Sequence, residues 1–103
     1  MEPDFQKLTV GIAGLGLMGG SFAKAYSAAG HEVLAWNRSK DTLEMAMMNG
    51  VVSGALNKET IGRCDLVIIA LYPQTTIDYL KEMAPYISKH TVVIDTCGVK
   101  RVV

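Results

Sequence analysis

Three glycines near the amino terminus, Gly14, Gly16 and Gly19, have the spacing of a loop that binds nucleotide phosphates. In such a loop the first glycine permits a tight turn, and the second lets the backbone approach a pyrophosphate. The third lets the following helix pack closely against the preceding strand. Backbone N–H groups near Leu17 and Met18 would then face the anion at the positive end of the helix dipole.

The residues about 20 positions beyond the loop indicate which dinucleotide binds, because NAD enzymes usually carry a carboxylate there that holds the ribose hydroxyls. This chain has Asn37, followed by Arg38, Ser39 and Lys40. Nothing there repels a 2′-phosphate, and Arg38 and Lys40 offer a fork of donors and a mobile charge. A solvated polar turn, with Ser39 or Asp41 capping the next helix, is also compatible with these residues. We predict NADP in preference to NAD.

Short apolar runs alternate along the chain with segments of helical periodicity. Strands are predicted at Leu8–Ala13, Glu32–Trp36, Val51–Leu56 (the weakest), Asp65–Leu71 and Thr91–Asp95. Helices are predicted at Ser21–Ala29, Asp41–Asn49 and Thr75–Ile87. The alternation predicts an α/β fold of the Rossmann type, a doubly wound, mainly parallel sheet with helices on both faces. The glycine loop then joins a strand to a helix, which is the context that gives its spacing meaning.

Each helix is expected to pack through one apolar face. In the first and third helices the inward residues are predicted to be Phe22, Ala25, Tyr26 and Ala29, and Ile77, Leu80, Met83 and Ala84. The second helix carries Met45, Met47 and Met48, which we interpret as filler of the core rather than as a binding groove.

Length and composition limit the possible functions. The chain has 103 residues, and we predict one nucleotide-binding domain over residues 1–103. Ten basic and ten acidic residues balance, so no overall field attracts nucleic acid or an anionic membrane. No apolar run approaches the roughly 18 residues of a membrane helix. Cys64 and Cys97 belong to no metal-ligand cluster, so we expect no metal, free thiols and a cytoplasmic location.

One further loop should contribute to a dinucleotide site. Leu71, Tyr72 and Pro73 follow the most apolar strand, so their backbone should pass the cofactor in the crevice beyond the strand ends. Pro73 also suits the first turn of a helix. Tyr72 could pack on a ribose or on nicotinamide, although an aromatic lid on the sheet edge is the commoner role.

Two motifs resemble those of one known family. The run Gly14-Leu15-Gly16-Leu17-Met18-Gly19-Gly20-Ser21, followed by Phe22-Ala23, looks like the opening of prephenate dehydrogenases, including their arogenate-using relatives. The family's second signature is an Asp followed closely by Ser-Val-Lys, and this chain reads Asp95-Thr96-Cys97-Gly98-Val99-Lys100. The resemblance extends from Val10 to Lys100.

The resemblance implies NAD(P)-dependent oxidative decarboxylation of prephenate to 4-hydroxyphenylpyruvate, in tyrosine and aromatic amino acid biosynthesis. The family's catalytic histidine comes from a His-Pro segment beyond the second motif. A following helical domain supplies much of the substrate pocket and the homodimer interface. Neither segment is present, so we expect a truncated piece that binds cofactor without turning over substrate. His31 and His90 do not match the family histidine and are interpreted as solvated turn residues.

The second motif departs from the family pattern in one position. Gly98 stands where the family has its motif serine, so Thr96 or Cys97 could substitute for that hydroxyl, or the departure could mark a subgroup. Lys100 is either a cation on the substrate side or an exposed lysine at a helix start. Thr96, Cys97, Gly98 and Lys100 are therefore candidates for the substrate side of the site. No residue of this chain is assigned as catalytic.

Two alternatives stay open. β-Hydroxyacid dehydrogenases also begin with a Gly-Leu-Gly-x-Met-Gly stretch and often prefer NADP, although Gly20-Ser21 and the second motif fit the prephenate family better. A His-Pro segment soon after Lys100 would support the prephenate family, and a helical domain with a catalytic lysine would support the hydroxyacid family. The other alternative is a non-catalytic NADP-binding module that is complete at this length.

Overall fold

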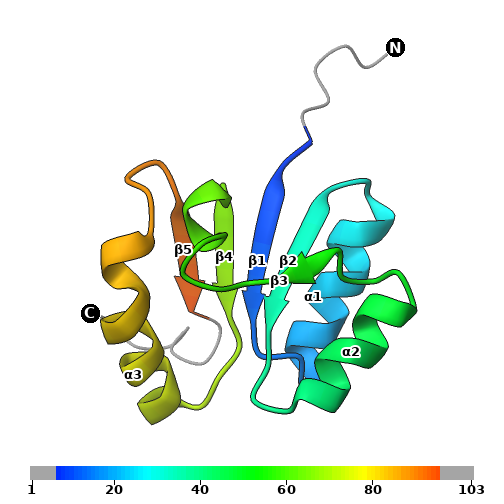
Figure 1. Ribbon diagram of the computed structural model, residues 1–103, viewed down its shortest axis with the longest axis horizontal. Coiled ribbons are helices and arrows are strands. Elements are labelled where there is room, and N and C mark those ends of the chain that lie inside the picture. Colours follow the sequence, from blue (N-terminus) through cyan, green and yellow to red (C-terminus); the bar gives the residue numbers. More distant parts are fainter. Residues whose placement is uncertain (1–6, 96–103) are drawn as a thin grey trace.

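The computed structural model describes residues 7–95 and contains one sheet of five parallel strands (Figure 1). In chain order the strands are β1 (Thr9–Ala13), β2 (Glu32–Trp36), β3 (Gly54–Ala55), β4 (Leu66–Ile69) and β5 (Val92–Asp95). Their order across the sheet is β3-β2-β1-β4-β5, so the chain builds outward from β1 in both directions. In sheets of this topology, ligands bind beyond the carboxyl ends of the strands at which the order reverses, and here these strands are β1 and β4. The predicted Rossmann-type α/β fold is confirmed.

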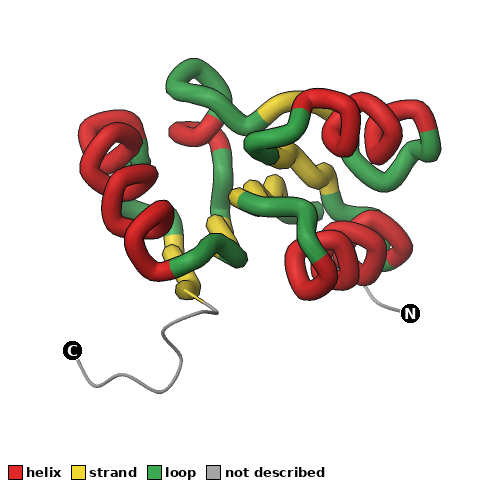
Figure 2. Tube along the Cα trace, turned by 90° about the horizontal axis from the view of Figure 1, so that it is seen from below, coloured by secondary structure: helices red, strands yellow, loops and turns green. Residues whose placement is uncertain are grey.

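Three α-helices cover the two faces of the sheet. They are α1 (Leu17–Ala28), α2 (Lys40–Met48) and α3 (Pro73–Met83), and the short 3-10 segments are η1 (Ile61–Arg63) and η2 (Ala84–Tyr86). Helices α1 and α2 pack on one face and α3 on the other, as Figure 2 shows from the carboxyl edge of the strands. Within residues 7–95 no helix is long and apolar enough to cross a membrane.

Alternate side chains of the central strands form two separate cores. The core under α1 and α2 contains the strand residues Val10, Ile12, Val33, Ala35 and Ile68. The core under α3 contains the strand residues Ala13, Leu34, Val67 and Ile69. A sheet covered on both faces needs strands that are apolar at nearly every position, and this requirement makes β1, β2 and β4 recognisable in the sequence.

Helix α1 begins earlier than predicted, at Leu17 rather than Ser21. Its first turns contain two glycines, which lower helix stability by roughly 0.5–1 kcal/mol each relative to alanine, so sequence propensity favours a later start. The predicted packing face is confirmed for Phe22 and Tyr26, which pack on the core under α1 and α2, and is wrong for the two alanines. Ala23 is fully buried, whereas Ala25 and Ala29 are exposed.

In α3 the predicted inward face is confirmed for Met83 and Leu80 and is wrong for Ile77 and Ala84. Tyr79 and Met83 are buried and Leu80 is half-buried, but Ile77 is 46% exposed. Ala84 is exposed and lies in η2, beyond the end of α3. Each residue turns a helix by about 100°, so a face centred between Tyr79 and Met83 leaves Ile77 on the solvent side.

The interpretation of the α2 methionines as core filler is wrong. Met45, Met47 and Met48 are 64%, 42% and 86% exposed, and the helix has no buried residue. Only Leu43 and Ala46 of α2 pack on the core. Helix α2 lies over the edge of the sheet, where β3 has only two residues. The apolar surface of the sheet is small there, so a narrow apolar stripe on α2 is enough to cover it.

The connection from β3 to β4 contains no α-helix. Only Gly54 and Ala55 pair with β2, within the weak strand predicted over Val51–Leu56. The chain then crosses the α3 face of the sheet through η1, which the sequence analysis did not predict. Along this crossover, Leu56, Ile61 and Cys64 are fully buried in the core under α3.

The Cys64 thiol is a structural group of that core. Burial raises the pKa of Cys64 from 9.0 to about 11, because the thiolate cannot be hydrated there. The Arg63 guanidinium opposes this shift, and the carboxylates of Asp65 and Glu32 add to it. The thiol is therefore protonated at neutral pH and a poor nucleophile.

The raised pKa predicts an alkaline loss of stability. The folded state holds the Cys64 proton more tightly than the unfolded state, so the stabilisation is complete below pH 9 and is lost as the pH rises through about 11. A pKa shift of this size corresponds to a loss of roughly 2–3 kcal/mol in the free energy of unfolding. Urea unfolding measures the free energy of unfolding at each pH in this range. For Cys64→Ala this free energy should decline less steeply with rising pH than for the parent chain, although the variant is less stable at neutral pH. Equal slopes would contradict the assignment.

Candidate functional site

The turn after β1 adopts a conformation that requires glycine. Gly14 has a φ of +99°, and a Cβ at this position would press on the Ala70 carbonyl group at the end of β4. The Gly14 N–H donates to the Trp36 carbonyl oxygen at 2.6 Å. The turn is therefore held between the carboxyl ends of β2 and β4, at the lower edge of the sheet in Figure 1.

The other two loop glycines differ in their surroundings. A Cβ at Gly19 would collide with the Gly14 carbonyl oxygen, so the first turn of α1 can lie against the end of β1 only if residue 19 is glycine. A Cβ at Gly16 would meet no described atom within 4 Å. Gly16 is exposed and has a φ of −69°, which any residue can adopt, so neither packing nor conformation explains glycine there.

The amino end of α1 can accept an anion. Gly16 is the N-cap residue, and it has no side chain to bond the free N–H groups of the first turn. The first turn of α1 contains no acidic residue that would oppose a negative ligand. The unpaired N–H groups and the helix dipole together favour a phosphate-like group at this end.

Asn37 joins the glycine loop to the exit of β2. Its Oδ1 accepts a hydrogen bond from the Leu15 N–H at 2.8 Å, and its Nδ2 donates to the Ser39 carbonyl oxygen at 3.0 Å. In the sequence, Asn37 is recognisable only as the replacement for a carboxylate. Its structural role was missed because the two bonded atoms of Asn37 and Leu15 are 22 residues apart in the chain.

The three residues after Asn37 lie on the surface beside the crevice. Arg38, Ser39 and Lys40 are all exposed. Ser39 is the N-cap of α2, and its hydroxyl oxygen accepts a hydrogen bond from the Thr42 N–H at 3.4 Å. The predicted capping role of Ser39 is thus confirmed, and Arg38 and Lys40 remain the cations of this turn.

The third loop at this edge follows β4. Leu71 is half-buried against the core under α3, and its carbonyl oxygen accepts a hydrogen bond from the Thr76 hydroxyl at 3.2 Å. Tyr72 is 82% exposed and is the N-cap of α3, which begins at Pro73. This loop therefore begins at the carboxyl end of β4, with the Tyr72 side chain largely in solvent.

The remaining predicted residues either lie outside the described part of the chain or lie elsewhere in the fold. Thr96, Cys97, Gly98 and Lys100 lie outside the described residues. The interpretation of His31 as a solvated turn residue is wrong, because it is half-buried and its Nδ1 accepts a hydrogen bond from the Leu8 N–H at 3.0 Å. This bond ties the entry of β1 to the entry of β2, at the edge opposite the crevice.

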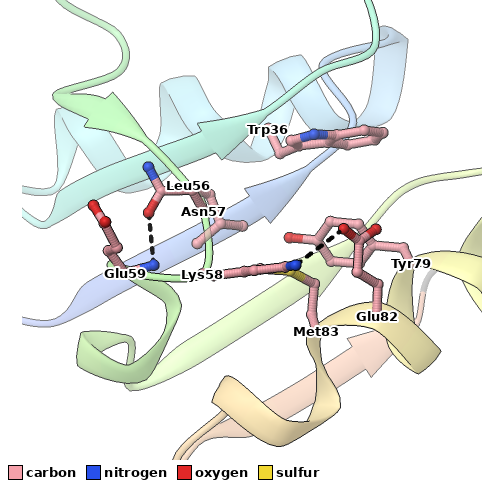
Figure 3. A pocket seen from close by; sticks show the side chains of 8 residues that line it. All are labelled: Trp36, Leu56, Asn57, Lys58, Glu59, Tyr79, Glu82 and Met83. Carbon is pink, nitrogen blue, oxygen red and sulfur yellow. Dashed lines mark hydrogen bonds and ion pairs between the residues drawn. The ribbon is translucent and has the colours of Figure 1, made fainter.

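An open pocket of about 440 Å³ lies beside α3 and was not predicted (Figure 3). Its lining comes from the end of β2, the crossover after β3 and the inner face of α3: Trp36, Leu56, Asn57, Lys58, Glu59, Tyr79, Glu82 and Met83. Burial raises the pKa of Tyr79, and Cys64 and Glu82 add to the shift, so its phenol stays protonated. No sequence signal could reveal the pocket, because its walls are separated by 20 residues or more along the chain.

Comparison with known proteins identifies the family. A family profile described as the NAD binding domain of 6-phosphogluconate dehydrogenase matches residues 9–101. The chain belongs to this family. It is therefore an NAD(P)-binding domain of the dehydrogenase type, with the glycine loop, the parallel sheet and the open carboxyl edge that such a domain requires.

Individual relatives span several activities. Arogenate dehydrogenase from Synechocystis is 25% identical with a TM-score of 0.79, over 85% of this chain and 32% of that one. An imine reductase from Pseudomonas sp. is 28% identical with a TM-score of 0.73, over 87% and 32%. The human cytokine-like nuclear factor N-PAC is 26% identical over 84% of this chain and 18% of its own length. The chain thus spans a third or less of these relatives.

The glycine loop gives two substitutions with opposite expected effects. Gly16→Val should leave thermal unfolding nearly unchanged but weaken NADP binding at least about tenfold, because its side chain would occupy the approach of the pyrophosphate. Gly19→Ala should instead lower stability by roughly 1–3 kcal/mol or more, through overpacking against Gly14. Circular dichroism melts and calorimetric titration measure the two effects. A Gly16→Val chain that binds NADP as tightly as the parent would refute the assigned phosphate position.

Proposed function

We propose that this domain binds NADP in preference to NAD and serves an NADP-dependent dehydrogenase. The observation that carries the proposal is the Asn37 amide at the end of β2, whose oxygen is engaged by the Leu15 N–H. An amide in this place does not repel a 2′-phosphate, whereas a carboxylate would. The exposed Arg38 and Lys40 supply the positive charge that such a phosphate needs.

The proposed roles follow from the three loops. The backbone from Gly14 to Gly19, including Leu17 and Met18, holds the pyrophosphate at the amino end of α1. Asn37, Arg38, Ser39 and Lys40 hold the phosphorylated ribose, with the Arg38 guanidinium as the bidentate partner. Leu71, Tyr72 and Pro73 line the path toward the nicotinamide. The bound cofactor supplies the hydride acceptor or donor, and the residues of this chain bind and orient it.

For the substrate we propose prephenate or arogenate, with the motif from Asp95 to Lys100 at the substrate side. Support comes from the resemblance of that motif to the prephenate dehydrogenase signature and from the likeness to arogenate dehydrogenase. That neighbour is about three times as long as this chain. We therefore propose that residues 1–103 function together with a further domain that supplies the catalytic histidine and the homodimer interface.

A small hydroxyacid is the second candidate substrate. It is favoured by the family profile, because 6-phosphogluconate carries a hydroxyl group β to its carboxylate. An activity assay of the full-length protein distinguishes the two candidate substrate classes. The protein is supplied with prephenate, L-arogenate or one of a series of β-hydroxyacids, and the formation of NADPH is monitored by its absorbance. Turnover of only the ring substrates supports the first candidate, and turnover of only the open-chain hydroxyacids replaces it with the second.

Cofactor choice can be tested in the turn after β2. Arg38→Ala should weaken NADP binding about 10- to 100-fold and leave NAD nearly unchanged, because only the charge-assisted contact to the 2′-phosphate is lost. Asn37→Asp should reverse the preference, since a carboxylate can still accept from the Leu15 N–H but repels the 2′-phosphate.

Calorimetric titration with both dinucleotides at low and moderate salt measures these effects. Lys24→Ala, on the exposed side of α1, is the matched control for loss of one positive charge. Equal losses of NAD and NADP affinity in Arg38→Ala would refute the 2′-phosphate role.

A further inference from the structure

Thr76 is a buried polar residue on the inner side of α3. It is 3% exposed and shares the buried face of the helix with Tyr79 and Met83, three and seven residues further on. Tyrosine aside, no other described residue with a hydroxyl, amide or charged side chain is buried. Burial of a hydroxyl is unfavourable unless it is hydrogen-bonded, so the presence of threonine here depends on its hydrogen-bond partner.

That partner lies outside the helix. A threonine within a helix usually returns its hydroxyl to the carbonyl oxygen four residues earlier. The Thr76 N–H makes the ordinary helical bond to that oxygen, on Tyr72, at 2.8 Å. The Thr76 hydroxyl instead donates to the Leu71 carbonyl oxygen at 3.2 Å, and Leu71 precedes the start of α3 at Pro73. The bond therefore ties the loop after β4 to α3.

The same loop lies against the glycine loop on its other side. A Cβ at Gly14 would be 2.5 Å from the Ala70 carbonyl oxygen and 2.9 Å from a methyl carbon of Leu71. The Ala70 N–H extends the pairing of β4 with β1 by donating to the Ala13 carbonyl oxygen at 2.8 Å. Leu71 is thus held between Gly14 and Thr76, at the lower edge of the sheet in Figure 1.

The bond to Thr76 also sets the direction of the next N–H group. The peptide between Leu71 and Tyr72 is trans, so its N–H points away from its carbonyl group. Because the carbonyl group is directed at Thr76, the Tyr72 N–H is directed away from Thr76, and it has no acceptor within residues 7–95. This free donor lies in the loop that follows β4, at the edge where sheets of this topology bind ligands.

We propose that Thr76 is a positioning residue of the dinucleotide site. Its hydroxyl holds the peptide between Leu71 and Tyr72 so that the Tyr72 N–H can donate to an oxygen in the nicotinamide half of the cofactor. The inference rests on the proposed path of the nicotinamide along this loop. Thr76 itself is too buried to contact a ligand, so it acts only through the peptide that it orients.

The test compares NADP with 2′,5′-ADP, which has the adenosine and the 2′-phosphate but no nicotinamide half. Thr76→Val keeps the shape of the side chain and removes the hydroxyl. In calorimetric titrations of the full-length protein, this variant should bind NADP about five- to tenfold more weakly than the parent and bind 2′,5′-ADP equally well. Thr76→Ser retains the hydroxyl and should restore the NADP affinity to within about twofold of the parent.

Thr91→Val is the matched control for loss of a hydrogen-bonded hydroxyl. The Thr91 hydroxyl also donates to a backbone carbonyl oxygen, that of Cys64, at 2.7 Å. Thr91 directly precedes β5, so this bond lies at the amino edge of the sheet, opposite the loop after β4. Both valine variants should lose thermal stability, whereas only Thr76→Val should lose NADP affinity.

Three results would overturn the inference. The first is an unchanged NADP affinity in Thr76→Val. The others are an equal loss of 2′,5′-ADP affinity in that variant and an equal loss of NADP affinity in Thr91→Val, because each would be a general effect of lower stability. A parent protein that prefers NAD would refute only the proposed cofactor preference, and the same comparison would then use NAD and 5′-AMP. A parent protein that binds neither dinucleotide would refute both proposals.

Discussion

The carbonyl oxygen of Gly14 lies so close to α1 that residue 19 can only be glycine. This contact sets the distance between β1 and α1, and with it the position of the free N–H groups at the start of the helix. Because α1 begins directly at the loop, those groups face the edge where β1, β2 and β4 end. A larger residue at position 19 would move α1 away from the sheet, and both the core around Ala23 and the anion site would be disturbed.

At the same edge one side chain, Asn37, links two segments of the chain. Asn37 holds the glycine loop through the Leu15 N–H and holds its own turn through the Ser39 carbonyl group. An aspartate could make the first of these bonds but not the second, since it has no N–H to donate. The geometry of the glycine loop and the charge at the end of β2 are therefore coupled through one residue. This coupling gives the amide a structural reason to be present whichever dinucleotide binds.

The sequence was informative where local chemistry decides the outcome. The central strands β1, β2 and β4 are apolar on both faces, so their alternation with helical segments was sufficient to predict the fold class. It was less informative about helix faces and ends. The early start of α1 and the exposed methionines of α2 both depend on neighbours: a carbonyl group that excludes any side chain, and a sheet edge too short to bury three thioethers.

By itself, then, the sequence determined the strand–loop–helix unit, the order of strands and helices, and the residues of the turn after β2, because these depend on spacing within about 30 residues. Only the tertiary structure decided which contacts these segments make with one another. It joined Asn37 to the glycine loop, buried Cys64 in the core under α3, and formed an open pocket lined by Trp36, Lys58 and Tyr79. Contacts between distant segments arise from how the layers pack on the sheet, and no local pattern of residue types records that packing.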